Sequence, residues 1–194
     1  TYYYVVTAQD TANNESNISN EASATPSGGG PAAPWINEFH YDNDGADTGE
    51  FVEVAGPAGT DMTGWKVIGY NGSGGAMYAT VNLSGSIPDQ QSCIGTLSVN
   101  FAAMQNGSPD GLALVNAANG VVQFISYEGA FTATDGPAIG MVSVDIGVSE
   151  ITTTPVGQSL RLAGTGKQYS DFAWQAPAAS TAGQKNTGQT FSDP

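Results

Sequence analysis

Seven carboxylate residues lie close together in the sequence, and their types and spacing indicate that they could bind a cation. They lie within 24 residues, although the whole chain of 194 residues has 18 Asp and Glu. The seven are Glu38, Asp42, Asp44, Asp47, Glu50, Glu53 and Asp61. A cluster of this kind can hold a hard cation, since calcium takes roughly six to eight oxygen ligands from a flexible loop.

The segment from residue 42 to residue 47, DNDGAD, alternates side-chain oxygens around a glycine, and a glutamate follows closely enough to close a loop. We therefore expect a candidate calcium site, and no other cofactor. Its ligands would be Asp42, Asn43, Asp44, Asp47 and Glu50, with Glu128 and Asp135 added if their loops reach the same end. The loop is not an EF-hand, because the closing glutamate comes too early. A solvated acidic loop without metal is the alternative.

His40 is the only histidine, which excludes zinc sites built on a histidine pair. It lies between two aromatic residues in an extended run, so we expect a packed or hydrogen-bonded side chain. A Ser-His-Asp triad could use it, but the sequence has no G-x-S-x-G nucleophile turn. We expect a protein that is not an enzyme; an enzyme would have to lose hydrolytic activity when Glu38 or His40 is changed.

Cys93 is the only cysteine, so the chain has no disulfide within itself. We expect its side chain to be a small buried hydrophobe rather than a reactive thiol. The fold must then be stabilised by packing alone.

The charge balance excludes one class of partner. Four Lys and Arg face 18 Asp and Glu, which gives a net charge of -14. Direct binding of nucleic acid needs clustered cations that displace counterions, so we do not expect it. No apolar run approaches 18 residues and no signal-peptide pattern is present, so we expect neither a membrane span nor a signal peptide in this sequence.

Short runs rich in β-branched and aromatic residues must position these side chains. None keeps a helical period over eleven residues, and Asn-Gly and Asp-Gly dipeptides separate many of them. The predicted strands after the first 34 residues are 35–41, 51–55, 65–70, 77–83, 94–101, 112–115, 121–127, 139–144, 159–162 and 172–174. Their number and spacing predict an all-β, antiparallel sandwich or barrel.

The chain divides into three predicted parts. Residues 1–26 read as a β-hairpin appendage, with strands at 2–8 and 21–25. Residues 27–34, SGGGPAAP, form a glycine- and proline-rich linker. Residues 35–191 hold the sandwich.

Several ordered motifs in residues 34–191 resemble the bacterial lamin-tail domain family. They are Trp35–Asp44, Gly49–Val54, Met62–Val67, Asn106–Leu114, Ser126–Gly129, Trp174 and Thr181–Asn186. Ala182 departs from the pattern, which usually has proline there. The resemblance implies an immunoglobulin-like β-sandwich that accompanies hydrolases in secreted bacterial proteins without being the catalyst. Residues 1–26 resemble the last two strands of a fibronectin type III domain.

These observations predict a non-catalytic, extracellular interaction or accessory module of a larger secreted bacterial protein, with neighbouring domains or identical subunits as partners. The alternative is a structural subunit of an extracellular filament or assembly, in which the hairpin adds its strands to a neighbour by β-augmentation. The partner-binding residues would then be Tyr2, Tyr3, Tyr4, Val5 and Val6. Residues 1–26 would in that case join identical chains into an oligomer.

Overall fold

The computed structural model describes residues 2–4, 7–17, 22–24, 33–102 and 104–192. The chain forms two compact units, Thr1–Pro31 and Ala32–Pro194. In the first unit, β1 (Tyr2–Tyr4) pairs with β2 (Ala22–Ala24) in an antiparallel ladder of three residue pairs. Val5, Val6 and most of the predicted linker, residues 27–32, lie outside the described residues.

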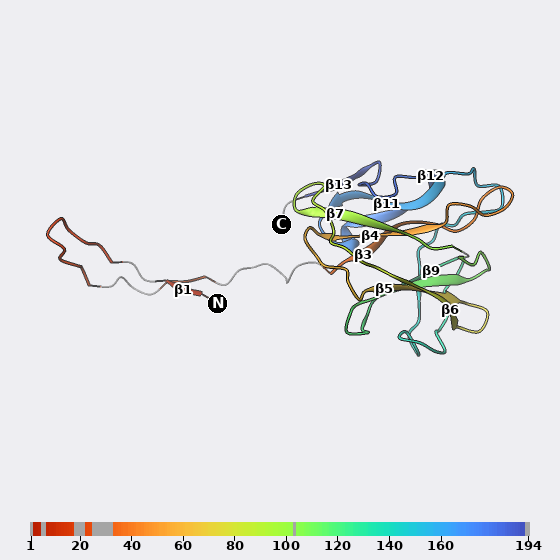
Figure 1. The fold of residues 1–194 in the computed structure, drawn as a ribbon, viewed down its shortest axis with the longest axis horizontal. Helices are drawn as coiled ribbons and strands as arrows, with labels where there is room; N and C mark the ends of the chain where they lie inside the picture. The colour runs from red at the N-terminus through yellow and green to blue at the C-terminus, as the bar shows by residue number, and fades with distance from the viewer. Residues whose placement is uncertain (1, 5–6, 18–21, 25–32, 103, 193–194) are drawn as a thin grey trace. The chain divides into compact units, whose positions relative to one another are not determined.

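The second unit is built from short strands and one 3-10 helix (Figure 1). The strands are β3 (Trp35–His40), β4 (Phe51–Pro57), β5 (Lys66–Asn71), β6 (Ala76–Asn82), β7 (Ile94–Asn100), β8 (Asp110–Val115), β9 (Val121–Tyr127), β10 (Val144–Asp145), β11 (Gln158–Gly166), β12 (Phe172–Ala179) and β13 (Gln189–Phe191). The helix, η1 (Tyr169–Asp171), lies between β11 and β12.

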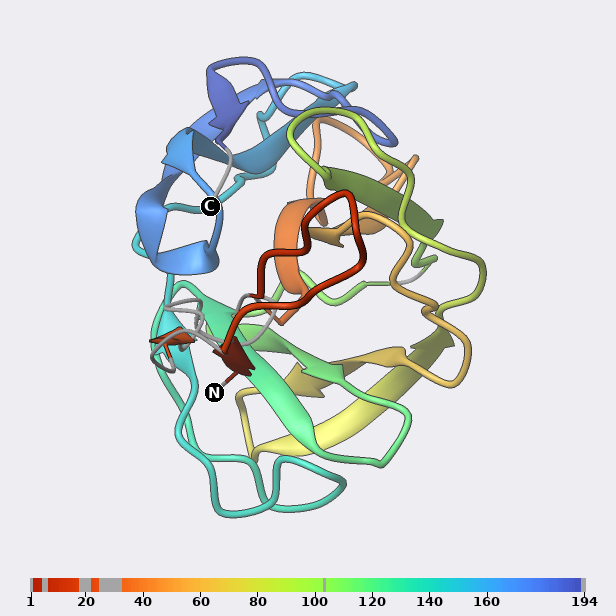
Figure 2. The same cartoon turned by 90° about the vertical axis from the view of Figure 1, so that its left-hand side faces the viewer.

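These strands form two sheets that face each other (Figure 2). The first sheet has the order β10-β9-β8-β5-β6, and the second has the order β12-β11-β3-β4-β7, with β13 beside β11. Neighbouring strands are antiparallel except for the pairs β10–β9 and β11–β13. The prediction of an all-β sandwich is therefore confirmed.

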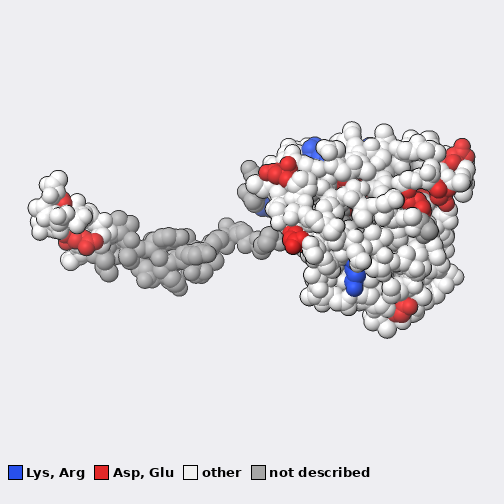
Figure 3. Space-filling view, viewed as in Figure 1, with Lys and Arg blue, Asp and Glu red and all other residues white. Residues whose placement is uncertain are grey.

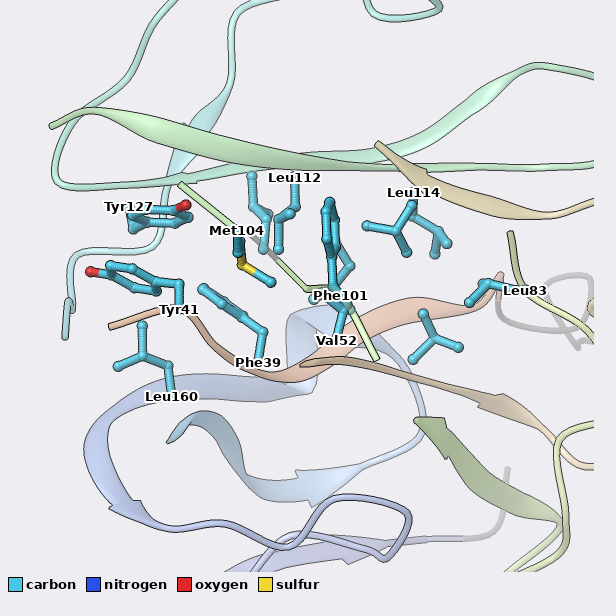
Figure 4. Close-up of a cluster of buried hydrophobic side chains, with 14 of the residues drawn as sticks. Phe39, Tyr41, Val52, Leu83, Phe101, Met104, Leu112, Leu114, Tyr127 and Leu160 are labelled. Carbon is cyan, nitrogen blue, oxygen red and sulfur yellow. The ribbon is translucent and has the colours of Figure 1, made fainter. Parts of the chain in front are cut away.

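The main hydrophobic core fills the space between the two sheets (Figure 4). Phe39 and Leu160 project into it from the second sheet, and Leu112 projects from the first. Tyr41 and Tyr127 stack across the layers, with ring centroids 4.0 Å apart and planes 19° from parallel. Ring stacking adds to the burial of apolar area, which is the main stabilising term.

Two strands contain a bulge that redirects polar side chains. In β3 the pairing with β4 shifts between Ile36 and Glu38, which leaves Asn37 as the extra residue. In β9 the pairing with β8 shifts before Gln123, which leaves Val122 extra. A bulge changes where neighbouring side chains point, and both Asn37 and Gln123 contribute to polar contacts described below.

The predicted strand 139–144 is largely wrong. Only Val144 and Asp145 form a strand there, because two turns interrupt the segment before it. Gly136 and Gly140 have φ of 62° and 78°, and the Ile139 amide donates to the Gly136 carbonyl. Glycine accepts this left-handed backbone readily, so the apolar run continues as a loop.

Candidate functional site

Two members of the acidic cluster, Glu38 and Glu53, lie side by side in the middle of the second sheet. They are cross-strand neighbours on β3 and β4, and neither is exposed to solvent. All four hydrogen bonds to the Glu38 carboxylate come from donors on residues 159, 180 and 181. The shortest joins the Ser159 hydroxyl to Oε1 at 2.6 Å, and the Thr181 hydroxyl donates to Oε2 at 2.7 Å.

Glu53 belongs to the same buried arrangement. Its Oε2 accepts from the Gly183 amide at 2.6 Å, and its Oε1 accepts from the Asn37 amide at 3.0 Å. Burial, followed by the charge of Glu38, raises the pKa of Glu53 to about 8. The Glu53 carboxyl is therefore mainly protonated at neutral pH, which spares the sheet two adjacent buried charges.

We call residues 180–191 the C-terminal clasp, because these contacts attach the segment to the second sheet. Asn186 donates to the carbonyls of Asn37 and Leu162 at 3.1 and 2.9 Å. Gln189 exchanges two hydrogen bonds with the Asn37 side chain, at 2.8 and 3.2 Å. Fully paired buried polar groups define a unique packing, so Glu38 and Glu53 hold the clasp in place.

His40 forms a second buried arrangement at one end of the sandwich. Its Nδ1 lies 2.9 Å from Oε1 of Glu150, and its Nε2 lies 3.1 Å from Oδ1 of Asn43. The Asn43 amide nitrogen donates to two carbonyls, which fixes its oxygen towards the histidine. Both ring nitrogens thus face acceptors, as suits an imidazolium ion.

The electrostatics agree with this geometry. Burial alone would lower the pKa of His40, but the hydrogen bond and charge of Glu150, together with Asn43, raise it overall. The second oxygen of Glu150 accepts from the amides of Tyr41 and Asp42, at 2.7 and 3.0 Å. The expectation of a hydrogen-bonded histidine matches these contacts, and its partner lies 110 residues away in the sequence.

The predicted calcium ligands differ from one another in burial and in hydrogen-bond partners. Asp42 and Asp47 lie together, and burial, followed by the charge of Asp47, raises the pKa of Asp42. Asp44 is exposed, whereas the Asn43 side chain is already used by His40, the Thr48 amide and two carbonyls. Glu50 is only 9% exposed. The described residues contain no group of three or more His, Cys, Asp or Glu arranged to hold a metal, and calcium binding stays a prediction.

The two further acids considered for this loop point to different places. Glu128 accepts from the Tyr41 hydroxyl at 3.0 Å, so it reaches the same end of the sandwich. Asp135 instead accepts from the Met77 amide at 2.7 Å. Figure 3 shows acidic side chains gathered at the end where Figure 1 places the loop between β3 and β4.

Cys93 corrects one expectation. Its side chain is exposed rather than buried. It lies in a tight turn with φ of 58°, in which the Ile94 amide donates to the Gln91 carbonyl. The turn directs the side chain outward, which the residue type alone could not show.

Several exposed apolar side chains lie close together in the sequence, and the sequence analysis did not predict their exposure. We define the apolar strip as Ile139, Met141, Val142 and Val144, which are 64%, 40%, 64% and 63% exposed. Between the two valines, Ser143 points inward, and its hydroxyl donates to the Ser126 hydroxyl at 2.8 Å. The strip is thereby anchored at the β10 edge of the first sheet. Ile151 and Val156, also exposed, lie between β10 of the first sheet and β11 of the second.

Comparison with known proteins found no match to this chain among family models, curated proteins or solved structures. Within the part of the chain that the structure describes, no helix is long and apolar enough to cross a membrane.

Proposed function

We propose that this chain is a non-catalytic interaction module of a larger secreted bacterial protein, and that it contacts a protein partner through the apolar strip. The observation that carries the proposal is the exposure of apolar side chains on one segment. Large apolar groups on a soluble surface commonly mark an interaction site when they gather in one place.

The charge of the chain indicates what kind of partner fits. The net charge is -14, whereas the only charged residues from 136 to 157 are Asp145 and Glu150. Glu150 is buried against His40. A partner surface that is apolar at its centre and neutral or basic at its rim would complement this edge and avoid the repulsion of other acidic faces.

The buried polar groups support a structural role for the residues that could do chemistry. Both ring nitrogens of His40 and both carboxylate oxygens of Glu150 are engaged inside the protein. Glu38 accepts four hydrogen bonds from the protein itself. Using these groups on a substrate would require breaking contacts that hold the fold together.

The resemblance to lamin-tail domains supports the same proposal. Three of its motif segments meet in the clasp network: Glu38 comes from the first, Glu53 from the second and Thr181 from the last. We propose on this basis an immunoglobulin-like accessory domain that functions outside the bacterial cell. Calcium bound at Asp42 and Asp47 would stabilise its end loops.

Site-specific photo-crosslinking tests the interaction. A photoreactive residue replaces Val142 or Val144 in the secreted chain of the producing bacterium, and a matched residue replaces Thr80 on the opposite edge strand, β6. We expect one protein adduct from the strip positions and none from Thr80. The recovered partner is then purified, and its affinity for the chain is measured by calorimetry.

Charge substitutions supply the matched comparison. The double variant Val142→Asp with Val144→Asp should weaken the affinity at least tenfold at an unchanged melting temperature, because both side chains are exposed. The control pair, Thr80→Asp with Asn82→Asp, adds the same charge to an exposed stretch of β6 and should bind like the wild type. Equal adducts from both edges, or equal affinities of both pairs, would reject the proposal.

A second candidate is the assembly subunit. Its support is the β1–β2 hairpin, whose described part pairs three residues of each strand, because an isolated two-stranded hairpin has little stability of its own. In an assembly, the strand containing Tyr2, Tyr3, Tyr4, Val5 and Val6 would add to a neighbouring sheet. Light scattering after size exclusion tests this: a monomer that is unaffected by removal of residues 1–30 would exclude it.

A further inference from the structure

A hollow of about 320 Å³ lies where the start of β9 comes near the start of β3 and η1. Its walls include Pro34, Trp35, Val122, Gln123 and the segment 168–170. Among the residues that the structure describes, none that lines the hollow carries a formal charge, although the chain has a net charge of -14. Small-ligand sites have volumes of roughly 300 to 1,000 Å³, so the hollow fits one small molecular unit.

The aromatic wall is held in place by the protein. The Tyr169 hydroxyl accepts a hydrogen bond from the Trp174 indole at 3.0 Å. The turn that contains Tyr169 is held by Asp171, whose carboxylate accepts hydrogen bonds from the amides of Lys167 and Gln168 at 2.9 and 3.1 Å. The half-buried ring of Tyr169 is therefore positioned before any ligand arrives, which lowers the entropy cost of binding.

Gln123 supplies an unsatisfied donor at the same wall. Its Oε1 accepts from the Ile36 amide at 2.7 Å, and this contact fixes which end of the side chain is oxygen. Its Nε2 is buried and has no hydrogen-bond partner among the described residues. A buried donor without a partner destabilises the folded chain. Nε2 has less than 1 Å² of accessible surface, so an acceptor oxygen in the hollow would pair with it once the Gln123 side chain shifts towards the opening.

We propose that the hollow binds an uncharged sugar residue, with one face of the sugar on the Tyr169 ring and a sugar oxygen accepting from Gln123 Nε2. An aromatic face and amide groups suit a ligand that is apolar on its faces and rich in hydroxyls. An acidic sugar would meet no countercharge in the walls and would be repelled by the chain as a whole. The site is separate from the apolar strip and does not depend on it.

Titration of the ¹⁵N-labelled 194-residue chain, followed by NMR, tests the proposal. The probes are glucose, maltotetraose, cellotetraose and tetra-N-acetylchitotetraose, with trigalacturonate as the acidic counterpart. At least one neutral probe should shift the side-chain amide of Gln123 and the backbone amides of residues 168–170 at millimolar concentration. A response to glucose indicates a free sugar, whereas a response to one tetrasaccharide alone indicates a polymer.

Variants separate the site from general effects. Gln123→Glu keeps an oxygen for the Ile36 amide but replaces the donor, so the affinity should fall at least tenfold. Gln175→Glu, the same change at an exposed position on β12, should leave it unaltered. Should Gln123→Glu fail to fold, Tyr169→Ala should show the same loss, whereas Tyr169→Phe, which keeps the ring but not the contact with Trp174, should lose less affinity than Tyr169→Ala.

Three results would overturn the proposal: no neutral probe shifts these resonances, trigalacturonate shifts them equally, or the loss of Gln123 Nε2 and of the Tyr169 ring leaves the affinity unchanged. The strip variant Val142→Asp with Val144→Asp should bind the sugar like the wild type. The sugar site and the proposed protein contact can therefore fail independently.

Discussion

Replacing Glu53 by glutamine should change how the stability of the fold depends on pH. Glu53 is fully buried beside Glu38, and burial, then the neighbouring charge, raises its pKa from an ordinary 4.5 to about 8. Between these two pH values the folded chain keeps a proton that the unfolded chain has lost. The free energy of unfolding must therefore fall as the pH rises through this interval.

The size of the effect follows from the same two values. Each pH unit in the interval costs about 1.4 kcal/mol, so the total loss from pH 4.5 to about 8 is on the order of 4 to 5 kcal/mol. The contribution of Glu53 is complete below pH 4.5 and is lost as the pH passes through its folded pKa. In Glu53→Gln this slope disappears, because the amide does not ionise.

The variant has a cost of its own at low pH. An amide nitrogen in place of Oε2 cannot accept from the Gly183 amide, so Glu53→Gln should be less stable than the wild type by about 1 to 3 kcal/mol at pH 5. The two stabilities should cross as the pH rises, and the variant should be the more stable protein at pH 9. Urea unfolding from pH 5 to 9, followed by tryptophan fluorescence, measures the free energy of unfolding of the wild type and of Glu53→Gln. Parallel curves over the whole range would refute the reasoning, since His40 contributes equally to both proteins.

Three other substitutions test the remaining contacts. Glu150→Gln leaves His40 without its buried counterion and should cost about 3 kcal/mol at pH 6 by urea unfolding; an unchanged midpoint would contradict the ion pair. Calcium at a hundredfold excess over its Kd should stabilise the wild type by about 2.7 kcal/mol, and Asp47→Asn should abolish this; a wild-type melting temperature unaffected by calcium would remove the metal site. Gly95→Ala would place a Cβ against the Pro88 carbonyl oxygen and should lower the free energy of unfolding by at least about 2 kcal/mol in thermal unfolding, whereas wild-type stability would show that the backbone around Pro88 adapts.

The fold class could be predicted because it depends on local patterns. The alternation of apolar residues and the Asn-Gly and Asp-Gly turns both act over a few residues. The segment 139–144 shows the limit of this reasoning. Its apolar residues are typical of a strand, but Gly136 and Gly140 introduce turns, and most of the side chains face solvent. Exposure depends on what packs against a segment, which composition does not reveal.

The candidate site could be predicted only in part, for a similar reason. The cluster of acids was visible, but the burial of Glu38 beside Glu53 and the pairing of His40 with Glu150 were not. Glu38 is held by Thr181, 143 residues away, and His40 by Glu150, 110 residues away. Pairings at such distances depend on which strands become neighbours in the folded sheets. The sequence placed Glu38 and Glu53 in the predicted strands 35–41 and 51–55, but it did not show that the two carboxyls face each other under the C-terminal clasp.

In the proposed function, the apolar strip makes the contact with a partner while the buried acids stabilise the fold. The most direct test is the affinity of the crosslinked and purified partner for three proteins: the wild type, the strip variant Val142→Asp with Val144→Asp, and Glu53→Gln. Calorimetry at pH 6 should show at least a tenfold loss for the strip variant alone. Wild-type affinity in the strip variant, or an equal loss in Glu53→Gln while that variant is still folded, would contradict the claim.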